Sequence, residues 1–173
     1  ALLTTEASEQ LEGVYGMGRD GSLGSGESLP AIQTLPEARR THERLLKYLS
    51  DERAAGLKQE DARSKLLKEV AFTWLNRLVA FKMMETRRRM RGSIDRLKDS
   101  NAFKFYLADH PDDMQLYEAG DTPQDALGEG PRDTAYRHFL LWQCGQTAGQ
   151  IKVLFDPEIL PSLLFPRPRA LRA

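Results

Sequence analysis

The sequence predicts a mainly α-helical fold: an irregular helical domain around one long central helix, with loops rich in glycine and proline. Residues 59–91 contain neither glycine nor proline and repeat apolar side chains at helical spacing. No alternating strand pattern longer than four residues occurs in the 173 residues. Hydrophobic residues make up 40% of the chain, which suffices for a core without help from a metal or a disulfide.

The N-terminal part combines short helices with a glycine-rich loop. Residues 1–12 can form a short helix, and six glycines within residues 13–30 indicate a loop or an irregular hairpin. Thr34 and Glu37 are spaced as a capping box, with a proline in the first turn, and predict the start of a surface helix. Gly56 then ends that helix in a left-handed cap.

The longest predicted helix covers residues 59–91. One face carries Leu66, Leu67, Val70, Trp74, Leu78 and Phe81. A second set widens the apolar surface and consists of Ala71, Phe72, Leu75, Val79, Ala80, Met83 and Met84. A helix that is apolar on more than one side is typical of a buried position, so we expect several neighbours to cover it.

Shorter elements follow the long helix. Ser93 can cap a helix that runs towards Leu107 and closes at Pro111. Residues 112–117 form one helical turn at most. Residues 119–131 include several glycines and prolines among acidic side chains, which indicates a mobile loop.

The C-terminal part contains one more long helix and an apolar segment. The helix is predicted over residues 133–151 and carries Tyr136, Phe139, Leu140 and Trp142. Residues 156–158 resemble a helix start, and the strongly apolar residues 159–165 follow.

These elements predict three segments. They are a loop-rich N-terminal segment at residues 1–34, a helical domain at residues 35–166, and a linker at residues 167–173 towards a downstream region. The chain begins with alanine rather than methionine and ends on a run of arginine and proline. We therefore expect a fragment of a longer protein.

Composition excludes several classes of protein. The 25 lysines and arginines balance 25 aspartates and glutamates, so the chain is neither a histone-like polycation nor an acidic tail. No apolar run approaches the roughly 18 to 20 residues of a bilayer crossing, and the first residues lack the pattern of a signal peptide. The single cysteine, Cys144, fits a reducing compartment. We expect a cytoplasmic protein without a membrane partner.

The sequence offers only weak candidates for a cofactor or metal site. Residues 16–21 match the G-x-G-x-x-G dinucleotide fingerprint, but no buried strand precedes them and no helix follows, so we interpret them as a plain turn. His42, His110 and His138 are scattered, and no zinc-ligand pair such as C-x-x-C occurs, so no metal is expected. Cys144 fits a small buried hydrophobe better than a nucleophile. No residue is assigned a catalytic, cofactor-binding or metal-binding role.

Charge is distributed unevenly along the chain. Residues 82–98 hold seven basic and two acidic side chains, whereas residues 108–133 hold eight acidic side chains and one arginine. The two stretches can touch, although an acidic run in such a loop is usually solvated. Candidate contacts to nucleic-acid phosphate are Arg87, Arg88, Arg91, Arg96 and Lys98. The alternative is that cations at the end of the long helix only complement its dipole. A second basic cluster consists of Arg167, Arg169 and Arg172, for which a linker is the alternative.

Three stretches resemble a known family. Residues 69–85, EVAFTWLNRLVAFKMME, and residues 154–165, LFDPEILPSLLF, are similar to the region upstream of the catalytic domain in PglX-like adenine-specific DNA methyltransferases of BREX phage-defence systems. Residues 15–21, YGMGRDG, are similar to a turn near the start of these proteins. Related methylases of DISARM defence systems and of large single-chain restriction-modification enzymes carry similar helices.

The resemblance implies a parent enzyme that transfers a methyl group from S-adenosylmethionine to N6 of an adenine rotated out of the duplex. The family's catalytic sequence, Asn-Pro-Pro followed by Tyr or Phe, does not occur in these 173 residues, and neither does its glycine-containing cofactor motif. No catalytic or cofactor-binding residue is therefore carried over. The resemblance implies a supporting role: packing on the methyltransferase core, contacting double-stranded DNA, or docking other subunits of the defence system.

A second hypothesis comes from another class of protein. The chain can be a free-standing helical protein-interaction module without a nucleic-acid role, with the apolar residues 159–165 as its docking surface.

Overall fold

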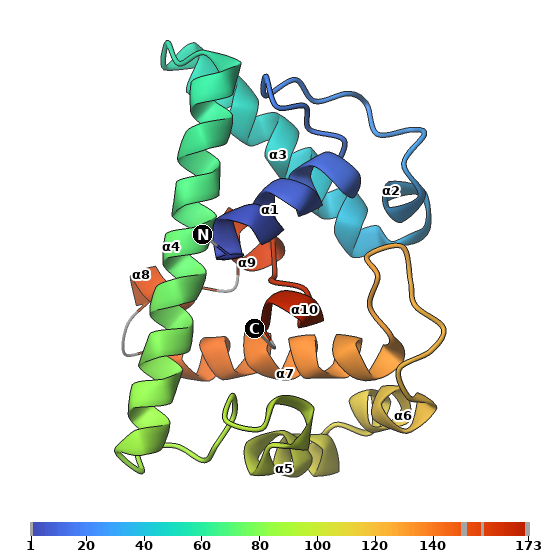
Figure 1. Ribbon diagram of the computed structural model, residues 1–173, viewed down its shortest axis with the longest axis vertical. Helices are drawn as coiled ribbons and strands as arrows, with labels where there is room; N and C mark the ends of the chain where they lie inside the picture. Colours follow the sequence, from blue (N-terminus) through green and yellow to red (C-terminus); the bar gives the residue numbers. More distant parts are fainter. Residues whose placement is uncertain (1, 150–151, 157, 172–173) are drawn as a thin grey trace.

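The computed structural model describes residues 2–149, 152–156 and 158–171 (Figure 1). Its elements are α1 (Leu2–Gly13), α2 (Pro30–Thr34), α3 (Pro36–Ala54), α4 (Gln59–Thr86), the 3-10 turn η1 (Leu97–Asp99), α5 (Asn101–Asp109), α6 (Pro111–Ala119), α7 (Pro131–Ala148), α8 (Lys152–Phe155), α9 (Leu160–Leu163) and α10 (Pro168–Leu171). Among the described residues, β-structure is limited to one isolated bridge between Met17 and Leu23. The predicted mainly α fold is confirmed.

Helix α4 is the element on which the others assemble. It has 28 residues and runs along one side of the molecule, where α1, α3, α8 and α9 contact it (Figure 1). Helix α7 runs crosswise to α4, and α5 and α6 pack against α7 (Figure 1). The short α10 packs against α1, so the last part of the chain returns to the first helix.

One hydrophobic core joins the parts of the chain that the sequence divides. Leu11 and Met17, from the expected N-terminal segment, are fully buried in the same cluster as Leu66 and Phe139. Ala170, within the expected linker, is buried as well. The expected boundaries near residues 34 and 167 therefore do not separate independent packing units.

Trp74 and Arg77 fasten the C-terminal part of the chain to α4. The indole N–H of Trp74 donates to the carbonyl oxygen of Pro161 at 2.6 Å, and its ring meets the ring of Phe165 edge-on at 4.8 Å between centroids. Fully buried Arg77 donates through Nε to the carbonyl oxygen of Leu154 at 2.7 Å. Because burial disfavours a charged group, the pKa of Arg77 is lowered from its ordinary value.

The same contacts show that residues 159–165 are not the exposed docking surface that the second hypothesis expects. Leu164 and Phe165 are buried, and Ser162 is held by Arg77, whose Nη2 donates to its hydroxyl oxygen at 2.8 Å. The apolar residues of this segment therefore serve the internal core, and most of their surface is not available to a partner.

Two predicted helix caps are wrong. The hydroxyl of Thr34 donates to the carbonyl oxygen of Pro30 at 2.8 Å and so belongs to α2, which leaves Leu35 as the uncapped start of α3. Ser93 is buried and donates to the backbone of Arg91. The cap of α5 is Ser100, whose hydroxyl oxygen accepts from the N–H of Phe103 at 3.4 Å.

The three remaining helix predictions differ in accuracy. Residues 112–117 belong to a helix of nine residues, α6, because Pro111 both ends α5 and fills the first turn of α6, where its missing N–H costs nothing. Helix α7 ends at Ala148 within the predicted residues 133–151, of which residues 150 and 151 lie outside the described part of the chain. The helix expected from residues 156–158 does not form there; α9 begins only at Leu160, and Pro157 is not described.

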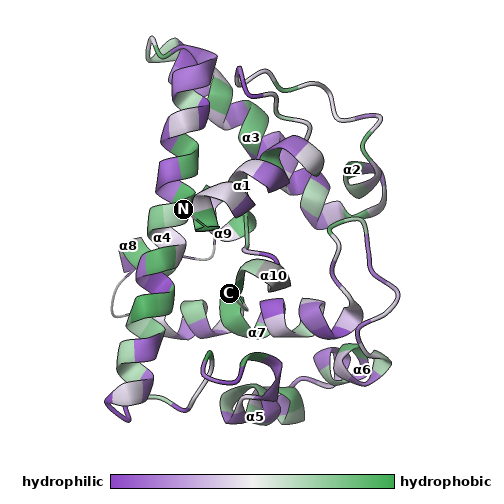
Figure 2. Ribbon diagram, viewed as in Figure 1, coloured by the Kyte–Doolittle hydropathy of each residue, from purple (hydrophilic) through white to green (hydrophobic). Residues whose placement is uncertain are grey.

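Several neighbours pack against α4 as expected, but they leave its outer face uncovered. The predicted inner face is buried at Leu66, Val70, Trp74 and Phe81. By contrast, Phe72, Leu75, Val79 and Met83 are 68%, 53%, 48% and 48% exposed. Figure 2 shows hydrophobic residues, in green, alternating with paler and purple ones along α4.

Candidate functional site

The candidate phosphate-binding residues lie in a turn, not on a helix. Helix α4 ends at Thr86, five residues before the predicted end, and Arg87 is its C-cap. Arg88 adopts the left-handed conformation with φ +54°, so the chain leaves the helix axis at this point. We call the segment Arg87–Arg91 the arginine turn. Arg87 lies at the C-terminus of α4, where its charge complements the helix dipole, whereas Arg88 to Arg91 follow outside the helix.

The hydrogen bonds of this turn form a Schellman motif. The N–H of Arg88 bonds to the carbonyl of Glu85 at 3.0 Å, and the N–H of Arg89 bonds to that of Met84 at 2.8 Å. Glycine is the usual residue at the left-handed position of this motif, because other residues are strained there. Helix α3 ends in the same motif with Gly56, whose φ is +91°. The chain thus places an arginine where glycine would fit more easily.

The side chains of the arginine turn are exposed and have no carboxylate partner. Arg87, Arg88 and Arg89 are exposed, and none of them makes a side-chain hydrogen bond or ion pair with the described residues. Arg89, which was not among the candidates from the sequence, belongs to this group. The guanidinium of Arg91 lies 3.9 Å above the centre of the exposed Phe105 ring, which orients it without neutralising it.

The two acidic residues that flank the turn in the sequence interact with other groups. Glu85 points inward, with 7% of its side chain exposed, and accepts from the backbone N–H groups of Ser93 and Ile94. Asp95 pairs with Lys82, and the charge and hydrogen bond of that lysine lower the pKa of Asp95. Arg96 is exposed beside Asp95. The positive charge of the turn therefore remains uncompensated locally.

Lys98 differs from the other four candidates. Its ammonium lies 2.5 Å from a carboxylate oxygen of Asp121 and 2.7 Å from one of Asp133, and 17% of its side chain is exposed. The expected contact between the basic and the acidic stretch is thus found at Lys98. A lysine held by two carboxylates has little capacity left for a phosphate.

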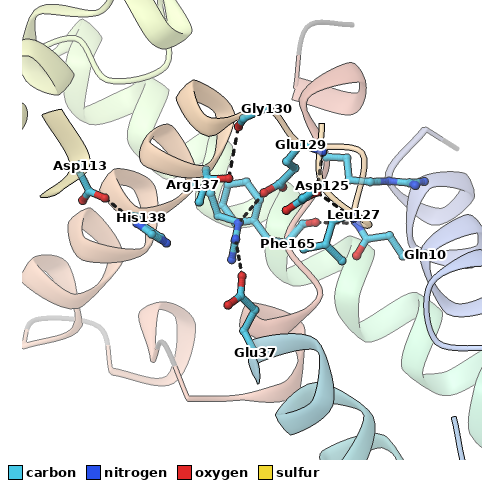
Figure 3. A network of polar contacts seen from close by, with 12 residues as sticks. Gln10, Glu37, Asp113, Asp125, Leu127, Glu129, Gly130, Arg137, His138 and Phe165 are labelled. Atoms are coloured by element: carbon cyan, nitrogen blue, oxygen red, sulfur yellow. Dashed lines mark hydrogen bonds and ion pairs between the residues drawn. The ribbon is translucent and has the colours of Figure 1, made fainter. Parts of the chain in front are cut away.

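The acidic loop at residues 119–131 is anchored rather than simply solvated. Glu129 is buried, 3% exposed, and accepts from Arg137 at 2.9 Å, while Arg137 also reaches Glu37 of α3 at 3.0 Å (Figure 3). Asp125 accepts from the backbone N–H groups of Leu127 and Glu129 at 2.8 and 2.9 Å. Burial raises the pKa of Glu129, against the lowering effect of Arg137.

A cavity of about 200 Å³ opens beside this network, but its charges compensate one another. Arg137 has two carboxylate partners, and Arg40 lies 3.6 Å from Glu158. Asp113, elsewhere in the acidic run, is also buried and bonds to Tyr106 and, at 2.7 Å, to His138 (Figure 3). These contacts hold α3, α6, α7 and the loop together, and we assign them a structural role.

The second basic cluster is dispersed. Arg167 donates to Glu6 at 2.6 Å and reaches Glu9 at 3.4 Å, so it ties the C-terminal part to α1. The side chain of Arg169 and the whole of Arg172 lie outside the described part of the chain.

The glycine-rich residues 16–21 form the expected plain turn. Gly18 accepts from Gly21, and its own N–H donates to Ser22 across the Met17–Leu23 bridge. A Cβ at Gly21 would lie 2.2 Å from the carbonyl oxygen of Gln59, so glycine is required for the close approach of this loop to the start of α4. Packing against α4 thus accounts for this glycine without a nucleotide.

The histidines and the cysteine occupy structural positions. His42 and His110 contact the backbone of Gly24 and Tyr106 at 3.0 and 2.7 Å. Cys144 is fully buried, and burial raises the pKa of its thiol to about 11, which suits a packed hydrophobe rather than a nucleophile. No group of three or more potential metal ligands occurs within the residues that the structure describes.

The family resemblance implies S-adenosylmethionine as the cofactor of the parent enzyme. Motifs that hold S-adenosylmethionine in the family include a glycine-bearing turn after a strand. The β-structure of the described residues is limited to the isolated bridge between Met17 and Leu23.

No helix of the described chain is both long and apolar enough to cross a membrane. Comparison with family models, curated proteins and solved structures found no match.

Proposed function

We propose that this chain is a non-catalytic helical region of an adenine-specific DNA methyltransferase from a cytoplasmic phage-defence or restriction-modification system. In this proposal it supports the catalytic core and binds the phosphate backbone of double-stranded DNA through the arginine turn. Methyl transfer and S-adenosylmethionine binding belong to the rest of the parent enzyme. The similarity of residues 69–85 and 154–165 to that family supports the enzymatic setting.

One observation carries the DNA contact: Arg87, Arg88 and Arg89 are exposed without a carboxylate partner, although the chain has as many acids as bases. Glu85 and Asp95, which flank the turn in the sequence, are instead used by the backbone at residues 93 and 94 and by Lys82. Exposed guanidinium groups in one turn suit phosphate oxygens, which accept two parallel hydrogen bonds from arginine.

The strained position of Arg88 supports a role beyond folding. A left-handed arginine costs roughly 1 kcal/mol relative to a residue that fits this conformation. Strained residues of this kind persist mostly where they serve a function. The segment that follows α4 lies at one end of the molecule (Figure 1), and Arg87, Arg88 and Arg89 are exposed in it.

The test is a charge reversal with a matched control. The double variant Arg88→Glu, Arg91→Glu should weaken binding to a labelled duplex of about 20 base pairs at low salt by at least tenfold, for any sequence of the duplex. The control, Lys47→Glu with Arg53→Glu, makes the same change in net charge at exposed positions of α3. Equal weakening by both pairs, or no binding of the unmodified chain at about 50 mM salt, would contradict the proposal.

A second candidate function is a helical protein-interaction module. The exposed apolar outer face of α4 favours it, since Phe72 alone is 68% exposed. The two functions are compatible within one accessory region, because the arginine turn begins where α4 ends.

A further inference from the structure

The outer face of α4 carries a continuous apolar stripe. It consists of Phe72, Leu75, Val79 and Met83, which are spaced by three, four and four residues and so lie on one side of the helix. At 1.5 Å per residue the stripe is about 16 Å long. Isolated exposed apolar residues are ordinary, but four aligned large ones, each about half exposed or more, indicate a surface for another molecule.

A groove lies directly beside the stripe. Its volume is about 660 Å³, and it shares Phe72 and Leu75 with the stripe. Its other walls come from the start of α1, the inner side of α4, the segment around η1 and α10, through Leu2, Leu3, Leu78, Ile94, Leu97 and Leu171. The combination of a ridge and a hollow offers both a flat apolar contact and a pocket for inserted side chains.

We propose that the stripe and the groove bind a short amphipathic helix of a partner protein whose apolar face is flanked by aspartate or glutamate. A helix of about three turns covers the stripe, and its larger side chains fill the groove. This inference does not depend on DNA binding.

The charges at the two ends of the stripe select an acidic partner. Lys68, one turn before Phe72, and Arg87, one turn after Met83, are both exposed and have no carboxylate partner among the described residues. Lys65 and Lys82, on the same side of α4, are already paired with Glu52 and with Asp95. An acid beyond each end of the partner's apolar face would meet Lys68 and Arg87.

The same charges disfavour a second copy of this chain. Pairing two stripes antiparallel would place Phe72 against Met83 and bring Lys68 of one copy to Arg87 of the other, where like charges repel. Four half-exposed side chains also supply less than the roughly 800 Å² that each partner of a stable dimer buries. A lipid bilayer would cover the ridge but leave the hollow of the groove unfilled.

The test uses a fluorescent peptide of about 18 residues with leucines at helical spacing and glutamates on both sides of them. Two control peptides are used: one keeps the composition but scrambles the leucine positions, and the other replaces each glutamate by lysine. The full chain is titrated against each, and anisotropy is measured. We expect binding of the acidic helical peptide and at least about tenfold weaker binding of both controls.

Variants locate the site. Val79→Glu should weaken peptide binding at least about tenfold, whereas Ser50→Glu, at an exposed position of α3, should leave it unchanged. Lys68→Glu should shift the preference towards the lysine peptide without changing DNA affinity, because Lys68 is far along α4 from the arginine turn. If Val79→Glu lowers the melting temperature, Phe72→Ser replaces it, since Phe72 is 68% exposed.

Four results would overturn the proposal. They are equal binding of the scrambled peptide, unchanged binding by both stripe variants, binding to phosphatidylserine vesicles without binding to the peptide, and a dimer in sedimentation that Val79→Glu dissociates. Loss of DNA binding in the arginine-turn variants with intact peptide binding would leave this inference standing, whereas an unmodified chain that binds DNA but not the acidic helical peptide would overturn this inference alone.

Discussion

At the scale of single residues, Trp74 links distant parts of the chain. Its side chain is fully buried and bonds to Pro161, 87 residues later. The guanidinium of Arg77 stacks over the same indole at 4.8 Å from its centre. The residue therefore contributes apolar burial, a hydrogen bond and a ring contact to one junction.

We expect Trp74→Ala to lower the free energy of unfolding by roughly 3 to 5 kcal/mol, because it opens a cavity and leaves the Pro161 carbonyl unpaired. Phe72→Ala, on the exposed side of the same helix, is the control and should change stability by less than about 1 kcal/mol. Urea unfolding followed by circular dichroism measures both. An unchanged melting temperature for Trp74→Ala would contradict the assignment of the core.

The partners of individual side chains limit how much of the candidate site can be predicted from the sequence. The exposure of Arg87 to Arg89 depends on where Glu85 and Asp95 point, and their partners are settled only by the fold. Lys98 finds Asp121 23 residues away. Nothing in the sequence indicates that Arg77 is buried and holds the C-terminal part, because its partners are mostly backbone carbonyls of a distant segment.

At the scale of elements, α1 and the C-terminal part are joined by the pair of Glu6 and Arg167. Arg167 donates to Glu6 through both its backbone N–H and its side chain. Burial alone would raise the pKa of Glu6, but hydrogen bonds from Arg167 and Gln10, together with the charge of Arg167, lower it below 4.5. The folded state therefore favours the ionised carboxylate more than the unfolded state does.

A group with a lowered folded pKa stabilises the protein above its unfolded pKa and loses this contribution as the pH falls through the folded value. We expect Glu6→Gln to be less stable than the unmodified chain at about pH 7 and equally stable once the pH is well below about 4. Chemical unfolding of both proteins across this range provides the measurement. An equal stability difference at all pH values would contradict the ionised pairing.

Element ends show why helices were predicted more accurately than their boundaries. Periodicity identifies α3, α4 and α7, since an apolar face is a local property of the sequence. Their ends depend on tertiary contacts: Thr34 is used by α2, and Glu85 turns back to the amides of Ser93 and Ile94. In the same way, the sequence predicts that α4 is apolar on two sides but not that only one of them is covered.

At the scale of the whole molecule, the chain is one core with two open surfaces at successive positions on α4. The apolar stripe occupies the outer face of the helix, and the arginine turn follows its C-terminus. By contrast, carboxylates of the acidic stretch form ion pairs within the molecule. Asp121 and Asp133 pair with Lys98, and Glu129 pairs with Arg137. A chain with zero net charge therefore presents an uncompensated basic region at one end of its longest helix.

The measurement that bears most directly on this view is the salt dependence of duplex DNA binding by the unmodified chain and by Arg88→Gly. Glycine suits the left-handed position, as Gly56 does at the end of α3, so the variant should melt at the same or a higher temperature. It should nevertheless bind DNA more weakly, and the slope of log affinity against log salt should become shallower by about 0.9, the value for one lost phosphate contact. Unchanged affinity and slope in a stable Arg88→Gly protein would show that the arginine turn does not contact DNA.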